Sequence, residues 1–141
     1  MIHGSTPQPQ GLYVPARRYR DMIFVSGMTP RENGKLLHVG QVVLEAPVET
    51  YRRAMELATK NALTAAKSHL VSGEQILSVL SLTVYVNAPA GYTLHSRIAD
   101  FASRFMEENT NDGVSSRAAI GVSSLPGDAT FEVSIIAAVG R

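Results

Sequence analysis

The segment 48–70 most constrains the fold, because its apolar residues recur at helical spacing and are rich in alanine. Pro47, just before it, suits the first turn of a helix. Alanine side chains are short, so we expect a β-sheet to approach this helix closely. A second amphipathic stretch, 98–106, predicts another helix.

Strand-like segments surround these two helices. Apolar or β-branched runs predict strands in the segments 12–20, 22–27, 76–86, 117–123 and 130–136, and Asn33-Gly34 predicts a short hairpin. The order strand, strand, helix, strand, helix, strand, strand predicts an α+β fold with the helices on one face of a sheet. A length of 141 residues fits one domain. We expect an N-terminal arm at 1–10 and a single domain at 11–141.

Composition excludes several classes of function. The absence of cysteine removes disulfides, zinc–thiolate sites and a catalytic thiol. The four histidines are scattered and no Gly-rich phosphate loop is present, so we expect no metal and no cofactor. A net charge of +1 argues against nucleic acid and anionic membranes as partners. Without a signal peptide or a membrane-length apolar run, we expect a cytoplasmic protein.

A tight turn is predicted between the last two strands. Pro126 and Gly127 fit the second and third positions of a type II turn, which requires a positive φ at the glycine. If the flanking strands form a two-residue hairpin, Val122 faces Phe131 on an apolar side that belongs against the helices.

The same register would place two charged residues on the other face. Arg117 and Glu132 would then share that face, with small residues such as Ala119 and Gly121 between them. Small residues leave space, so the pair can enclose a molecule of a few carbons. A structural ion pair at a subunit contact and a plain solvated face remain alternative interpretations.

Several segments together resemble one known family. The segments 24–27 and 116–139, supported by 11–18, 61–70 and 85–93, resemble the YjgF/RidA family, also called endoribonuclease L-PSP, and in particular a subgroup distinct from its best-studied deaminases. The resemblance implies a chorismate-mutase-like fold and a homotrimer with a site in each cleft between subunits. It also implies hydrolysis of reactive enamine and imine intermediates to 2-keto acids and ammonia, without a cofactor.

The resemblance assigns roles to three residues of this chain. Arg117 matches the arginine that binds the substrate carboxylate, and its planar fork suits that task. Glu132 matches a glutamate that places the attacking water. Tyr13 matches a tyrosine that lines the site. The expected ligand is a small 2-imino or 2-keto acid.

Other matching positions form the pocket wall or depart from the deaminase pattern. Ser26 and Gly27 match wall residues. Ala119 stands where deaminases often have cysteine, so only the main-chain contact with the substrate is retained. Met28 replaces a common glutamine, and Ser96 lies where an asparagine is frequent. These departures concern the substrate more than the fold.

Two other functions remain open beside the deaminase. The chain can be a non-catalytic trimer that binds small carboxylates through the same arginine. Ribonuclease action or translation inhibition is the third candidate, from the family's older name. The near-zero net charge, the lack of an RNA-stacking motif and the lack of a histidine pair argue against it.

Overall fold

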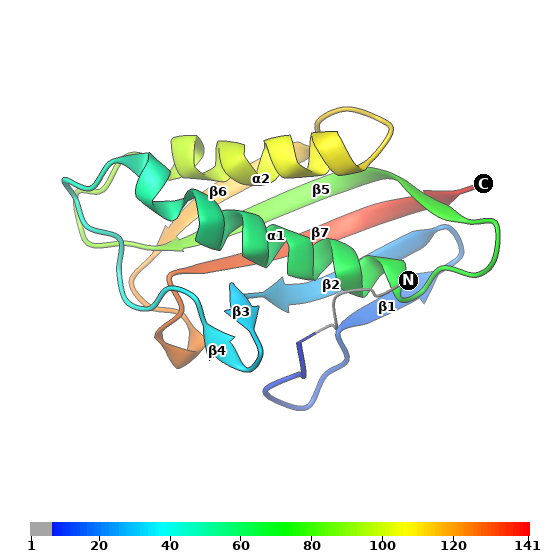
Figure 1. Cartoon of the computed structure of the whole chain (residues 1–141), viewed down its shortest axis with the longest axis horizontal. Coiled ribbons are helices and arrows are strands. Elements are labelled where there is room, and N and C mark those ends of the chain that lie inside the picture. Colours follow the sequence, from blue (N-terminus) through cyan, green and yellow to red (C-terminus); the bar gives the residue numbers. More distant parts are fainter. Residues whose placement is uncertain (1–6) are drawn as a thin grey trace.

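The computed structural model describes residues 7–141, and both long helices lie on the same face of a five-stranded sheet (Figure 1). Across the sheet the strands are β1 (Ala16–Tyr19), β2 (Met22–Met28), β7 (Phe131–Gly140), β5 (Gln75–Asn87) and β6 (Ser116–Val122). Only β5 and β6 run parallel. The predicted α+β architecture, a mixed sheet with two helices on one face, is confirmed.

The helices and the small elements complete the chain. These are η1 (Val48–Tyr51), α1 (Arg52–Lys67), α2 (His95–Asn109), the hairpin strands β3 (Arg31–Glu32) and β4 (Lys35–Leu36), and the short 3₁₀ turn η2 (Pro126–Asp128). No helix within residues 7–141 is both long enough and apolar enough to cross a membrane.

Alanine brings α1 close to the sheet, as predicted. Ala58, Ala62, Ala65 and Ala66 have no exposed surface, and they face the core between helix and strands. The predicted helical segment 48–70 divides into η1 and α1, and its last residues form a turn rather than further helix.

The predicted Asn-Gly hairpin is also present. Asn33 and Gly34 connect β3 to β4, and both have positive φ, 53° and 80°. Two consecutive positive φ values are typical of the type I′ turn, which matches the twist of the flanking strands.

The turn at Gly127 is confirmed, but the hairpin around it is wrong. Gly127 has φ 66°, and the Asp128 N–H donates to the Leu125 carbonyl at 3.0 Å. Nevertheless β6 and β7 do not pair, because β5 lies between them. Pro and Gly determine the local turn, whereas the partners of a strand depend on long-range burial.

Asn87 shows how the chain crosses the end of β5. Its backbone N–H donates to the Thr130 carbonyl at 2.9 Å, and its buried side-chain amide donates to the Ala129 carbonyl at 3.0 Å. These bonds hold the segment 123–130 as it passes from one edge of β5 to the other. The 13-residue β5 can therefore pair with β6 on one edge and with β7 on the other.

This topology separates Arg117 from Glu132, which the expected hairpin would have placed on the same face of the sheet. Arg117 aligns with Leu82, which is fully buried under the helices, so Arg117 lies on the helix side. Glu132 aligns with Tyr85 on the opposite, helix-free face. The expectation that Arg117 and Glu132 share one face of one chain is therefore wrong.

The helix-free face carries more large apolar residues than expected. Its strands expose Tyr19, Met22, Phe24, Leu80 and Ile120, each by more than a third of its surface. Several exposed large apolar residues on one sheet face favour a contact with another molecule.

An ion pair fastens the edge strand β1 to the loop that precedes β5. The Arg18 guanidinium donates to both carboxylate oxygens of Glu74, at 2.7 and 2.8 Å, and to the His69 carbonyl at 2.9 Å. Glu74 is only 8% exposed and also accepts the Val71 N–H. The bonds from Arg18, followed by the bond from Val71, lower the pKa of Glu74 to about 2.

We predict that Glu74→Gln lowers the melting temperature at about pH 7 by several degrees, because Arg18 loses the carboxylate that accepts two of its hydrogen bonds. A carboxyl group whose pKa is lower in the folded state stabilises the fold at pH values above the ordinary glutamate pKa of about 4.3. The difference between wild type and variant should therefore shrink as the pH falls toward 2. Thermal melts across this range test it, with Glu107→Gln, an exposed residue of α2, as control. The same pH profile in both variants would contradict the prediction.

Candidate functional site

A hollow of about 160 Å³ opens beside the end of β2. Its walls come from the N-terminal segment 7–15, the end of β2, β3, the turn η2 and the start of β7, and it includes Tyr13, Gly27, Met28, Arg31 and Glu132. We call it the Glu132 hollow. Three residues expected in the site, Tyr13, Gly27 and Glu132, thus lie together.

Glu132 is the carboxylate of this hollow. It is half-buried, and among residues 7–141 it has no hydrogen-bond or ion-pair partner. Burial disfavours the charged form and raises the pKa of Glu132 above its usual value. A raised pKa makes the carboxylate a stronger base, which favours its use as a proton acceptor.

Gly27 leaves the space that Glu132 occupies. A Cβ atom at this position would overlap the Glu132 carboxylate, so only glycine is compatible with the observed side chain. The pairing of β2 with β7 is also irregular between Val25 and Met28. Gly27 therefore lines the hollow and allows the close approach of the Glu132 side chain.

Ser26 supports the wall from behind. Its hydroxyl donates to the Val14 carbonyl at 2.6 Å, and its N–H donates to the Pro15 carbonyl at 2.9 Å. These bonds hold the segment that carries Tyr13 against β2. The Tyr13 hydroxyl accepts the Gln10 N–H at 3.1 Å, and the ring is about half exposed.

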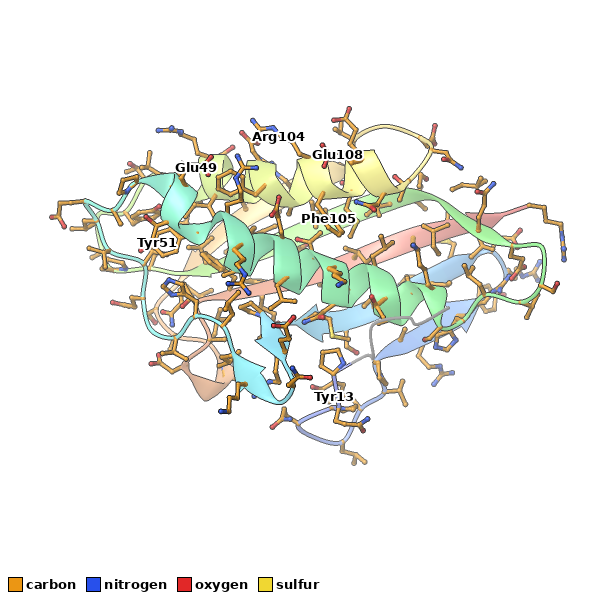
Figure 2. The ribbon with its side chains drawn as sticks, in the orientation of Figure 1. Tyr13, Glu49, Tyr51, Arg104, Phe105 and Glu108 are labelled. Atoms are coloured by element: carbon orange, nitrogen blue, oxygen red, sulfur yellow. The ribbon has the colours of Figure 1, made fainter. Side chains whose placement is uncertain are left out.

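Arg117 lies elsewhere, beneath α2. Its Nη1 donates to Asp100 at 2.9 Å and to Ser103 at 3.0 Å, and its Nη2 donates to the Ser96 hydroxyl at 2.8 Å. We call these four residues the Arg117 cluster. Tyr13 lies at the β3–β4 side of the molecule, across from α2 (Figure 2). Within one chain, Arg117 therefore does not share a site with Tyr13 and Glu132.

Small residues of β6 continue the Arg117 cluster along the strand. Ala119 packs at the border of the core on the same side as Arg117. At Gly121 a Cβ atom would overlap the ring of His95, so the first turn of α2 lies close to the strand. Arg117 and Ala119 thus form one half of the expected site, and Tyr13, Gly27 and Glu132 form the other.

Two charged residues of these halves were not expected from the sequence. Asp100 neutralises Arg117, and Arg31 lines the Glu132 hollow. No spacing rule in the sequence distinguishes either residue from the other charged residues of the chain. Only the topology, which brings α2 over β6 and β3 beside η2, identifies them.

A model of the endoribonuclease L-PSP family matches residues 3–139. The chain belongs to this family, also known as YjgF/RidA. The resemblance seen in the sequence is thereby confirmed. Among curated proteins, no sequence matches the chain significantly.

Several solved structures are similar to this L-PSP family chain over most of its length. The protein Atu1372 of Agrobacterium tumefaciens, of unknown function, is 29% identical with a TM-score of 0.79, covering 92% of this chain and 82% of that one. A candidate endoribonuclease from Shewanella oneidensis is 26% identical with a TM-score of 0.85, covering 95% and 89%. TdcF from E. coli, solved with bound serine, is 22% identical with a TM-score of 0.61, covering 94% and 92%. The fold is thus the chorismate-mutase-like fold of this family.

We predict that Glu132→Gln raises the melting temperature of this L-PSP family chain by one or two degrees at about pH 8. The folded-state pKa of Glu132 is raised, so ionisation opposes folding, and the penalty grows as the pH rises above the ordinary glutamate pKa. Below about pH 4, where the carboxyl group is neutral in both states, the difference should vanish. Thermal melts at both pH values test this, and lower stability of the variant at pH 8 would contradict it.

Proposed function

We propose that this L-PSP family protein hydrolyses reactive enamine and imine intermediates to 2-keto acids and ammonia. The observation that carries the proposal is the half-buried, unpaired carboxylate of Glu132 in a hollow that also holds Tyr13. The reaction needs a positioned water and a group that relays protons, and it needs neither a nucleophilic side chain nor a metal.

The proton transfers follow from the raised pKa of Glu132. Water adds through its oxygen to the iminium carbon, the C=N electron pair moves to nitrogen, and Glu132 takes a proton from the water. Glu132 then returns the proton to the amino nitrogen of the carbinolamine. The C–N bond breaks toward nitrogen, and the hydroxyl proton leaves with ammonia as ammonium, which gives the 2-keto acid.

We further propose a homotrimer in which Arg117 of one subunit completes the Glu132 hollow of the next. Within one chain the two residues lie on opposite faces of the sheet, which supports a site built from two subunits. The exposed apolar residues of the helix-free face favour burial against another copy. Arg117 would bind the substrate carboxylate, and Ala119 would offer its main chain beside it. The serine bound in TdcF is an amino acid with such a carboxylate.

A non-catalytic protein that binds small carboxylates is the second candidate. The observation that favours it is the ion pair of Arg117 with Asp100, because a ligand carboxylate must then compete with a carboxylate already present. Such competition weakens binding and suits a reversible sensor of abundant ligands. The names endoribonuclease and translation inhibitor attached to similar structures favour an RNA target, but the net charge of +1 gives no basic surface for it.

We predict that Glu132→Gln lowers the rate of imine hydrolysis by about 10²-fold, in the range lost with a general base. Binding of the 2-keto acid product should change little, because the shape of the side chain is retained. The imine is generated in situ by an amino-acid oxidase, and keto-acid formation is measured above the spontaneous rate. Glu107→Gln is the control. Equal rates for Glu132→Gln and wild type would exclude Glu132 from the mechanism and favour the sensor.

A mixing experiment tests the shared site. Arg117→Ala and Glu132→Gln should each have strongly reduced activity alone, because every site then lacks one of the two groups. Co-expressed in equal amounts, they should recover about a quarter of the wild-type activity, the fraction of sites that pair an intact Arg117 with an intact Glu132 from a neighbour. Light scattering should show trimers. No recovery in mixed trimers would mean that the two residues do not form one site.

A further inference from the structure

Arg31 lines the Glu132 hollow, and its backbone is firmly held. The Arg31 N–H donates to the Thr29 carbonyl at 2.8 Å. The amide of Asn61, which is 6% exposed on α1, donates to the carbonyls of both Thr29 and Arg31, at 3.0 and 2.9 Å. The buried amide thus fixes the chain on both sides of Pro30 and directs Arg31 from a rigid position.

The guanidinium of Arg31 is available for an anion. It donates one hydrogen bond, from Nη1 to the Gly34 carbonyl at 3.0 Å, and no carboxylate of residues 7–141 forms an ion pair with it. By contrast, Arg18, Arg52 and Arg117 each pair with a carboxylate. Since a guanidinium has five N–H donors, most of those on Arg31 have no partner among residues 7–141.

The surroundings of Arg31 orient it within the hollow. The turn η2 lies beside the β3–β4 hairpin (Figure 1), and a Cβ placed on Gly127 would lie 3.7 Å from Nη2 of Arg31. Both Pro126 and Gly127 line the hollow with Arg31 and Glu132. Arg31 and Glu132 do not pair with each other, so a cation and an anion share one hollow without neutralising each other.

We propose that Arg31 binds a second carboxylate of the ligand, so that the site prefers dicarboxylic 2-imino and 2-keto acids to monocarboxylic ones. This inference rests on the proposed function, in which Arg117 of a neighbouring subunit binds the carboxylate next to the imine carbon. The Glu132 hollow then holds the reacting carbon, and Arg31 remains for the far end of the ligand. A planar guanidinium fork matches a carboxylate in two parallel bonds.

Calorimetric binding of two keto acids of equal chain length tests the preference. The probes are 2-oxoglutarate, which has two carboxylates, and 2-oxovalerate, which has one. Wild type should bind 2-oxoglutarate at least about tenfold more tightly, as expected for one added charge-assisted contact. Arg31→Gln should reduce the difference to within about twofold while the Kd of 2-oxovalerate stays unchanged.

Two further variants test whether the preference depends on Arg31 and on its guanidinium. Arg53→Gln, which removes an exposed arginine of α1, should keep the wild-type preference. Arg31→Lys retains the positive charge but lacks the planar guanidinium, so it should keep part of the preference for 2-oxoglutarate. Equal affinity of wild type for both acids would overturn the inference, as would a preference that survives in Arg31→Gln. Loss of both ligands in Arg31→Gln would also overturn it, because Arg31 would then bind the carboxylate assigned to Arg117.

Imine hydrolysis separates this inference from the proposed function. If the monocarboxylic imine is hydrolysed and no dicarboxylate preference exists, only the role of Arg31 fails. If the Arg31-dependent preference for 2-oxoglutarate exists without hydrolysis, the catalytic proposal fails and the role of Arg31 in ligand choice stands. If neither keto acid binds, both fail.

Discussion

Hydrogen bonding along both edges of β5 is the constraint on which the rest of the structure depends. β5 pairs in parallel with β6 and antiparallel with β7, and its alternate residues, among them Leu82, Val84 and Val86, have no exposed surface. Asn87 at its end ties down the segment that crosses from β6 to β7. Because β5 separates these strands, Arg117 is turned toward α2 and Glu132 toward the helix-free face. The two halves of the proposed site are separated by this one arrangement of strands.

The two halves differ in how their charges are satisfied. In the Arg117 cluster the guanidinium already bonds to a carboxylate and to serine hydroxyls, so a ligand there exchanges one set of bonds for another. In the Glu132 hollow the carboxylate and the Arg31 guanidinium are both without ion-pair partners among residues 7–141. Unpaired charge in a partly buried hollow costs stability, and such a cost is typical of groups kept for binding or catalysis. These two charges make the hollow suitable for a polar ligand.

The proposed trimer joins these halves and also explains the apolar character of the helix-free face. A sheet with helices on one side only leaves its other face open, and this one exposes aromatic and aliphatic residues such as Tyr19, Phe24 and Ile120. A neighbouring subunit can cover them and bring its Arg117 cluster toward the hollow. One interface would then supply both burial of apolar surface and the second half of the site.

The sequence by itself determined the local features. The alanine stripe predicted α1, Asn33-Gly34 predicted the β3–β4 hairpin, and Pro126-Gly127 predicted the turn with positive φ at the glycine. Each depends on backbone preferences or periodicity within a few residues, which a sequence states directly. The family, and with it the fold, was also visible in the sequence motifs.

Only the tertiary structure decided which strands pair and therefore which residues share a face. A correct turn does not determine a hairpin, because a third strand can enter between its arms when that arrangement buries more apolar surface. Because β5 lies between β6 and β7, Arg117 and Glu132 lie on opposite faces of the sheet and not on one face as expected. The same reason applies to Arg31, which lines the Glu132 hollow, and to Asp100, which pairs with Arg117. Their neighbours come from distant parts of the chain, and no local sequence pattern encodes such contacts.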